Sequence, residues 1–331
     1  MADYLYGSAR IRVLENALIG KDRMEILLQT KTLSELMGRL KEFGFEWKTD
    51  PASGAVLREE TLLSRLREAY REVLSLCDND PALKLWLYPY DCNNLKVAIK
   101  CFFRQIDPIP MTFDFGTVSA EQIVKMVETR AFTDLPEAMT AAAEEAMAEY
   151  SKTRNPQLVD LILDRACYRD MLAAAETSGS AFVKALLQKK IDLTNLMICV
   201  RILRMQSGEA GKMLLRDALL EGGTLAQDQL LDWFEGGESF LWDRLAYSSY
   251  DRLARTVSES DKSLTAVERS MDDAWMEEIR TARYVPYGAE VLVAYLLAYE
   301  AEVRNLRILL AGKEAELPTQ IIRERIRESY V

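Results

Sequence analysis

The stretch YEAEVRNLRILLAGK, residues 299–313, places an asparagine inside an otherwise continuous helical pattern of apolar residues. Asn305 is followed directly by Leu306, which the same pattern assigns to a core-facing position. Asparagine is a poor helix former, because its side chain competes for backbone hydrogen bonds. An amide in this place therefore needs a structural or functional reason.

The stretch has two relatives in the same chain. The segments DCNNLKVAI at 91–99 and DLTNLMICV at 192–200 read acid-x-x-Asn-Leu-x-aliphatic, as does EVRNLRILL at 302–310. Their asparagines lie 101 and 110 positions apart, which is the length of a small domain and far longer than the repeat of a solenoid protein. The spacing predicts one helical unit used three times.

Segments upstream of the motif repeat at similar distances, which makes coincidence a poor explanation. They are ILLQTKTLSEL (26–36), KMVETRAFTDL (125–135) and, more loosely, DWFEGGESFLWDRL (232–245). Three homologous helical units of about one hundred residues each are the economical interpretation. The predicted units are 1–110, 111–212 and 213–331.

Helical periodicity dominates the rest of the chain as well. In LLSRLREAYREVLSL (62–76) the apolar residues recur at the spacing of one helix face, and no convincing alternating strand pattern appears. Proline and glycine cluster at breaks between such stretches, at 78–82, 106–116, 154–157, 207–211 and 284–288. The predicted fold is therefore all-α.

The repeated motif has a direct physical content. On an α-helix, positions i, i+3 and i+4 share a face, so each unit presents a carboxylate, an amide and a leucine together. The residues are Asp91, Asn94, Leu95; Asp192, Asn195, Leu196; and Glu302, Asn305, Leu306. Two interpretations remain: the amides fix packing by bonding a neighbouring helix or loop, or they line a shared site. We favour the first.

Composition excludes several classes of chemistry. The chain has no histidine, which rules out Ser-His-Asp and Cys-His catalysis and removes the commonest transition-metal ligand. Five cysteines, without C-x-x-C pairing, predict reduced and buried thiols, and they are Cys77, Cys92, Cys101, Cys167 and Cys199. A net charge of −10 disfavours nonspecific binding to nucleic acid.

The sequence favours a cytosolic protein. The first residues, MADYLYGSARIRVLENALIG, carry charges where a secretory signal needs an uninterrupted apolar region. The longest apolar-aromatic run, VLVAYLLAY (291–299), is about half of the roughly 20 residues that a membrane-spanning helix needs. We expect neither export nor a membrane span.

Two segments resemble catalytic motifs only superficially. QSGEAGKM (206–213) lacks the first glycine of a phosphate loop and has Met213 in the place of its Ser/Thr, so it predicts a loop or helix end. DDAWMEE (272–278) resembles the magnesium motif of all-helical terpene synthases, but Met276 replaces the third acid. A solvated helix face is the favoured interpretation. From these motifs we predict no catalytic, cofactor-binding or metal-binding residue.

The threefold repeat, together with three segments, resembles a known family. The segments are YGSARIRVLE (6–15), DCNNLKVAIK (91–100) and YEAEVRNLRILLAGKEAELPTQIIRERIRESYV (299–331). They are similar to the C subunit of bacterial and archaeal V/A-type rotary ATPases, the equivalent of the d subunit in the eukaryotic vacuolar enzyme. Ser8 stands where the family usually has Asn, and Met197 breaks a basic position after Asn-Leu.

The resemblance implies a fold and a role. Three related helical domains would form a pseudo-threefold funnel, present once per complex, on the cytoplasmic face of the proteolipid rotor ring. Its socket would receive the axle formed by the D and F subunits and transmit torque during proton or sodium transport, without catalysis, cofactors or direct ATP binding.

Two alternatives stay open at this point. One is a magnesium-dependent helical enzyme of the isoprenoid type, which would lose turnover when Asp272 or Asp273 is replaced by alanine. The other is a generic helical adaptor. Neither the repeat nor the resemblance identifies the residues that contact a ring or an axle, and the transported ion and the direction of operation depend on other proteins of the complex.

Overall fold

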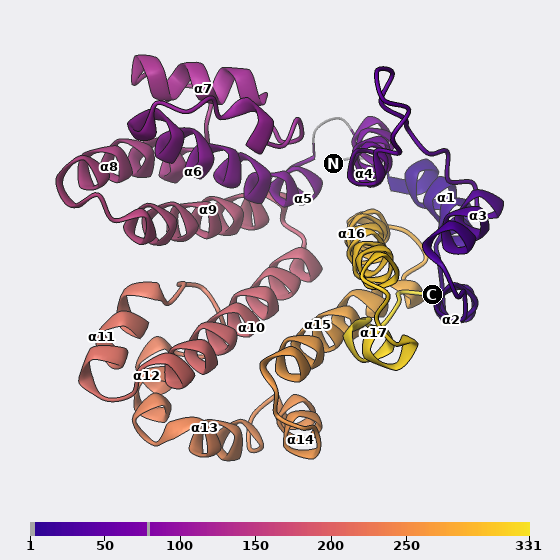
Figure 1. The fold of residues 1–331 in the computed structure, drawn as a ribbon. Coiled ribbons are helices and arrows are strands. Elements are labelled where there is room, and N and C mark those ends of the chain that lie inside the picture. Colours follow the sequence, from indigo (N-terminus) through magenta and orange to yellow (C-terminus); the bar gives the residue numbers. More distant parts are fainter. Residues whose placement is uncertain (1–3, 78–79) are drawn as a thin grey trace. The chain divides into compact units, whose positions relative to one another are not determined.

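The computed structural model describes residues 4–77 and 80–331, and within these ranges it is helical throughout (Figure 1). It has no strand there, only an isolated antiparallel bridge between Thr49 and Val56. The prediction of an all-α fold is confirmed. Backbone contacts divide the chain into two compact units, one made of 1–78 with 245–331 and one made of 79–244.

The first unit combines segments from both halves of the sequence. Its α-helices are α1 (Tyr4–Leu14), α2 (Lys21–Leu28), α3 (Leu33–Glu42), α4 (Arg58–Leu76), α14 (Asp251–Glu259), α15 (Leu264–Arg280), α16 (Ala289–Glu314) and α17 (Thr319–Arg325). Two 3-10 turns belong to it, η1 (Glu15–Ala17) and η4 (Thr281–Tyr284). Helices separated by most of the chain thus share one core.

Helix α16 forms the centre of this unit, because it contacts α1, α3, α4, α15 and α17. Every residue from Val291 to Tyr299 is at most 8% exposed. A helix that is apolar on all sides must be buried on all sides, and here the surrounding helices bury it. Among the described residues, no helix combines the length and apolar character that crossing a membrane requires.

The second unit follows the sequence without interruption. Its helices are α5 (Pro81–Lys84), α6 (Tyr88–Arg104), α7 (Ala120–Thr129), α8 (Glu137–Thr153), α9 (Pro156–Ser178), α10 (Ala181–Met205), α11 (Glu209–Ala218), α12 (Gln227–Glu235) and most of α13 (Gly237–Leu245), with 3-10 turns η2 (Leu85–Leu87) and η3 (Ile109–Met111). Helices α8 and α9 pack as a hairpin (Figure 1). Buried alanines on α8, such as Ala143 and Ala146, let the two backbones approach.

The predicted breaks fall between helices or at their ends, because those at 78–82, 154–157 and 207–211 run into the first turns of α5, α9 and α11. Residues 78–79 lie outside the described part of the chain. QSGEAGKM begins at Gln206, the C-cap of α10, and runs into the start of α11, with Gly208 at the N-cap of α11, which confirms the prediction of a loop or helix end. Several helices begin at hydroxyl side chains that accept a hydrogen bond from the first turn, namely at Thr32, Ser119, Ser180 and Ser263. Local sequence therefore sets these helix starts.

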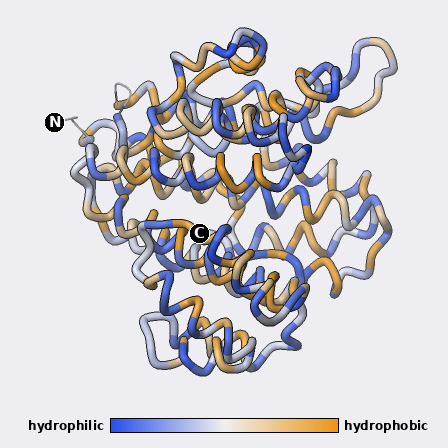
Figure 2. Tube along the Cα trace, turned by 90° about the vertical axis from the view of Figure 1, so that its left-hand side faces the viewer, coloured by the Kyte–Doolittle hydropathy of each residue, from blue (hydrophilic) through white to orange (hydrophobic). Residues whose placement is uncertain are grey.

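Hydrophobic and hydrophilic residues alternate around most helices, which is the pattern of elements with one buried face (Figure 2). The five cysteines are free and buried, which confirms that part of the prediction. Burial raises the pKa of the Cys199 thiol to about 12, so this thiol is unreactive at neutral pH.

Candidate functional site

The three repeated asparagines make the same pair of hydrogen bonds. Asn94 donates from Nδ2 to the carbonyl of Phe113 over 2.8 Å, and its Oδ1 accepts from the Phe113 N–H over 2.8 Å. The same two-point pairing joins Asn195 to Leu220, over 2.9 and 2.8 Å, and Asn305 to Arg327, over 3.0 and 2.9 Å. In each case a side-chain amide pairs with the backbone N–H and carbonyl of one downstream residue.

The repeated acids bind backbone near the same loops. Asp91 accepts from the N–H groups of Thr117 and Val118 and from the Thr117 hydroxyl. Asp192 repeats this arrangement with Thr224 and Leu225. In the third motif Glu302 accepts from the Ile19 N–H over 2.6 Å. We name each such set, an acid and an amide on one helix with the backbone they hold, a junction.

The junctions are buried. Asp91, Asn94, Asp192 and Asn195 are 0% exposed, Asn305 is 1% and Glu302 6% exposed. The leucines beside the amides, Leu95, Leu196 and Leu306, are 0% exposed. Each amide uses both its carbonyl oxygen and its amino group on the protein's own backbone, which leaves little capacity for a ligand. This geometry supports a packing role for all nine residues, and we propose that role for them.

Burial also shifts the pKa values of two of the repeated acids. It raises the pKa of Asp91 to about 6, against the opposing effect of the hydrogen bonds from Thr117 and Val118. It raises the pKa of Glu302 to about 7, opposed by the Ile19 N–H and by the charges of Arg65 and Arg23. Packing of the core, without a substrate nearby, is sufficient to explain both shifts.

Sequence reasoning missed the loop residues of the first two junctions, although a signal existed. Both loops contain Gly-Thr followed by an aliphatic residue, at 116–118 and 223–225. The glycines are required by close approach, because a Cβ on Gly116 would overlap Asp91 Oδ1 and one on Gly223 would overlap Asp192 Oδ1. The repeated tripeptide could therefore have located the partners of the acids.

We expect Gly223→Ala to lower the free energy of unfolding by about 2 kcal/mol, because the added methyl group must displace the Asp192 carboxylate from its hydrogen bonds. Urea denaturation of purified protein measures the change. Gly38→Ala is the matched control: Gly38 lies exposed within α3 with open space around its Cβ position, and alanine there should stabilise by about 0.5–1 kcal/mol. Equal stability of Gly223→Ala and the unmodified chain would contradict the prediction.

The DDAWMEE segment is not a solvated helix face, and that interpretation is wrong. Asp272 accepts from Arg304 Nη1 over 2.8 Å and from Arg327 Nε over 2.9 Å. Asp273 accepts from the Glu328 N–H over 2.7 Å. Both carboxylates hold the segment that follows α17, which a count of charges along one helix could not reveal. In the described part of the chain, no three potential metal ligands among His, Cys, Asp and Glu gather.

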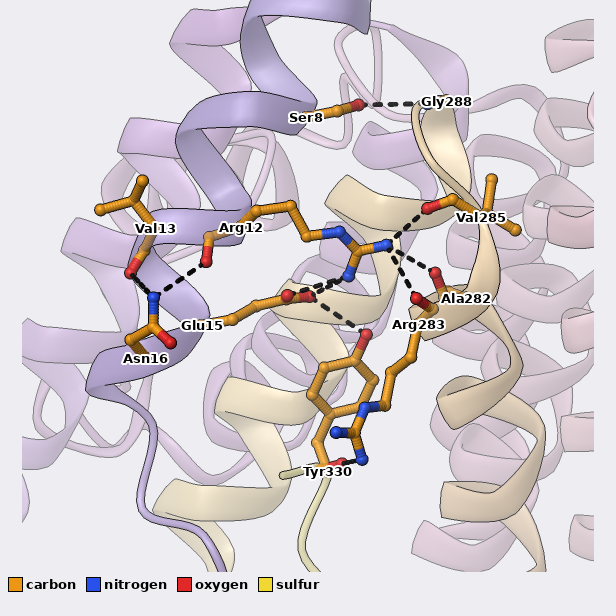
Figure 3. A network of polar contacts seen from close by, with 10 residues as sticks. All are labelled: Ser8, Arg12, Val13, Glu15, Asn16, Ala282, Arg283, Val285, Gly288 and Tyr330. Carbon is orange, nitrogen blue, oxygen red and sulfur yellow. Dashed lines mark hydrogen bonds and ion pairs between the residues drawn. The ribbon is translucent and has the colours of Figure 1, made fainter.

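The N-terminal segment that carried part of the resemblance anchors α1 to the start of α16 (Figure 3). The buried Ser8 accepts from the Gly288 N–H over 3.1 Å. Arg12 donates from Nη2 to the carbonyls of Ala282, over 2.8 Å, and Val285, over 2.6 Å, and pairs with Glu15 over 2.9 Å. These polar groups too are engaged by the protein's own chain.

Fold and junctions together define an all-helical protein whose buried motif residues bind its own backbone. The chain belongs to the ATP synthase (C/AC39) subunit family, whose model matches residues 8–325. The resemblance found in the sequence is confirmed.

Three relatives extend the match over nearly the whole chain. The C subunit of the V-type sodium ATPase of Enterococcus hirae is 25% identical, covering 97% of both chains. The C subunit of the A-type ATP synthase of Methanocaldococcus jannaschii is 22% identical over 98% of this chain and 86% of its own. That of Haloferax volcanii is 27% identical over 96% and 95%. These names describe a structural component of the complex and not its catalytic part.

Proposed function

We propose that this chain is the central-rotor C subunit of a V/A-type ATPase or ATP synthase. In this role it is a socket that couples the axle of the D and F subunits to the proteolipid ring and transmits torque. One copy serves each complex, peripheral to the membrane on its cytoplasmic face. The chain binds no ATP and carries no ion; ion transport follows from the complex.

One observation carries the proposal beyond the family match: the same junction is built three times from one motif. Each junction ties a motif helix to another segment through three or more hydrogen bonds, two to the amide and at least one to the acid. Buried, satisfied polar networks fix one packing arrangement and resist shear. A part that transmits torque needs such stiffness, and a threefold use of one unit suits a pseudo-threefold funnel around an axle.

Reconstitution tests the proposal. Membranes that hold the ring and the nucleotide-binding head, depleted of this chain, should hydrolyse ATP without ion transport, and adding the purified chain together with the D and F subunits should restore coupling. Native mass spectrometry of the restored complex should show one copy. The proposal is overturned if the chain stays unbound beside an intact ring and axle, or if coupling is complete without it.

A further inference from the structure

The third junction differs from the first two in how its parts are connected. In the first, the amide pairs with the N–H and carbonyl of Phe113, and the acid binds the N–H of Val118. These two residues lie five positions apart on one loop. The second repeats this spacing with Leu220 and Leu225. In the third, the corresponding residues come from segments that most of the chain separates.

The place of Ile19 identifies its equivalents. In each junction the residue whose N–H binds the acid stands immediately before the N-cap of a helix. Val118 precedes Ser119, the cap of α7, and Leu225 precedes Ala226, the cap of α12. Ile19 likewise precedes Gly20, the cap of α2. The acid of each motif helix therefore binds the residue just before the N-cap of another helix. Helix α6 binds the residue before the cap of α7, α10 the one before the cap of α12, and α16 the one before the cap of α2.

The segment after Arg327 runs toward that entry. Val331 stands four residues after Arg327, as Thr117 stands four after Phe113 and Thr224 four after Leu220. The carbonyl of Val331 accepts from the Lys21 N–H over 3.2 Å. A Cβ on Gly20 would lie 2.9 Å from the same carbonyl oxygen, so the two segments are in direct contact. Ile19 occupies the position that corresponds to the sixth residue of the other two loops.

We infer that residues 326–331, which we name the strap, form with residues 19–21 the non-covalent counterpart of the loops 113–118 and 220–225. The strap closes the third repeat onto the first. This inference rests on the junctions alone and not on the proposed rotor function.

Side chains on three elements hold the strap in place. Asp272 and Asp273 on α15 bind Arg327 and Glu328. Arg280 Nε donates to the Ser329 carbonyl over 2.8 Å, and Arg283 Nη1 to that of Tyr330 over 3.3 Å. Tyr330, 3% exposed, donates its hydroxyl to Glu15 over 3.1 Å (Figure 3). The DDAWMEE segment thus binds the strap through Asp272 and Asp273.

Whether the two halves of a junction are covalently continuous determines which junction opens first. A loop that is covalently continuous returns to its motif helix quickly, because its two halves stay within a few residues of each other. The two halves of the third junction are joined only through the rest of the chain and through the hydrogen bonds given above. Local opening should therefore be concentrated at the strap and at residues 19–21, which open together.

Amide hydrogen exchange of the full chain tests this, with NMR resolving six matched N–H groups: Phe113, Leu220 and Arg327, bound by amides, and Val118, Leu225 and Ile19, bound by acids. Arg327 and Ile19 should exchange at one common rate, about tenfold or more faster than the other four. If they are protected as well as the other four, or exchange at unrelated rates, the strap is not a separable closing element.

A disulfide between cysteines introduced by Lys21→Cys and Val331→Cys would link residues 19–21 covalently to the strap. Because the five native thiols are buried, the introduced pair should react selectively. Oxidation should slow exchange at Ile19 and Arg327 to the rates of the other four and leave those four unchanged. The reduced double variant and each single variant are the controls. Failure of the disulfide to form under oxidant, or equal slowing of all six amides, would overturn the inference.

Discussion

Replacing Asn195 by leucine should lower the free energy of unfolding by about 4 kcal/mol, one of the largest effects available to a single substitution of similar volume in this chain. The change removes two hydrogen bonds, and it also leaves the backbone N–H and carbonyl of Leu220 without these partners. Leu220 is 3% exposed, so water cannot replace the lost bonds. Urea denaturation measures the loss.

The comparison variant is Met197→Leu, which introduces the same side chain on the same helix at a half-buried position. It should change the free energy of unfolding by less than about 1 kcal/mol, because methionine and leucine fill similar volumes. For Asn195→Leu, binding to the axle and ring should remain normal for the fraction that is folded. Unchanged melting with lost assembly would show instead that Asn195 contacts a partner.

Replacing Glu302 by glutamine should remove a large part of the pH dependence of stability. The folded-state pKa of Glu302, raised to about 7 by burial, lies above its ordinary value of 4.5. The folded protein therefore binds this proton more tightly than the unfolded chain does. The resulting stability is fully present below about pH 4.5 and is lost as the pH rises through about 7.

Between pH 5 and 8 the unmodified chain should lose on the order of 2 kcal/mol relative to Glu302→Gln, because glutamine keeps an acceptor for the Ile19 N–H and has no proton to lose. The variant should equal or exceed the parent in stability at pH 8. Urea denaturation across this range gives the difference directly. Glu128→Gln, at an exposed position on α7, is the control and should follow the parent curve. Parallel curves for Glu302→Gln and the parent would contradict the assignment.

The hydrogen bonds that the acid accepts differ between the third junction and the other two. Asp91 and Asp192 each accept from two N–H groups and a threonine hydroxyl. At Asp91 these bonds oppose the rise in pKa that burial causes. Glu302 binds the Ile19 N–H without the hydroxyl that Thr117 and Thr224 supply, because Val331 stands at the place of these threonines. Glu302 is consequently held in its ionised form by fewer backbone and hydroxyl donors than the two aspartates.

The motif illustrates how far sequence reasoning reaches. The acid, the amide and the leucine were identified as one helix face, because periodicity fixes which side chains of a helix lie together. The partners of that face were not identified. Phe113, Leu220 and Arg327 share no side-chain type, since the bonds go to their backbone, and a backbone partner leaves no trace in composition.

The DDAWMEE segment shows the converse error. Its charges resemble those of an exposed helix, and the sequence alone favours that interpretation. The structure brings Arg304 and Arg327 to Asp272 from two other segments of the chain. Ion pairs between distant segments depend on where helices pack, and no local rule predicts them.

The sequence by itself determined the all-α class, the helix breaks, the threefold motif and the family, because each of these rests on local periodicity or on the order of segments. Tertiary structure alone decided that Glu302 and Asn305 of α16 bind Ile19 and Arg327, and that the strap binds α15. The physical reason is that hydrogen bonds to backbone and contacts between distant segments are selected by the packing of the whole core. Residue types constrain that packing without specifying which loop meets which helix.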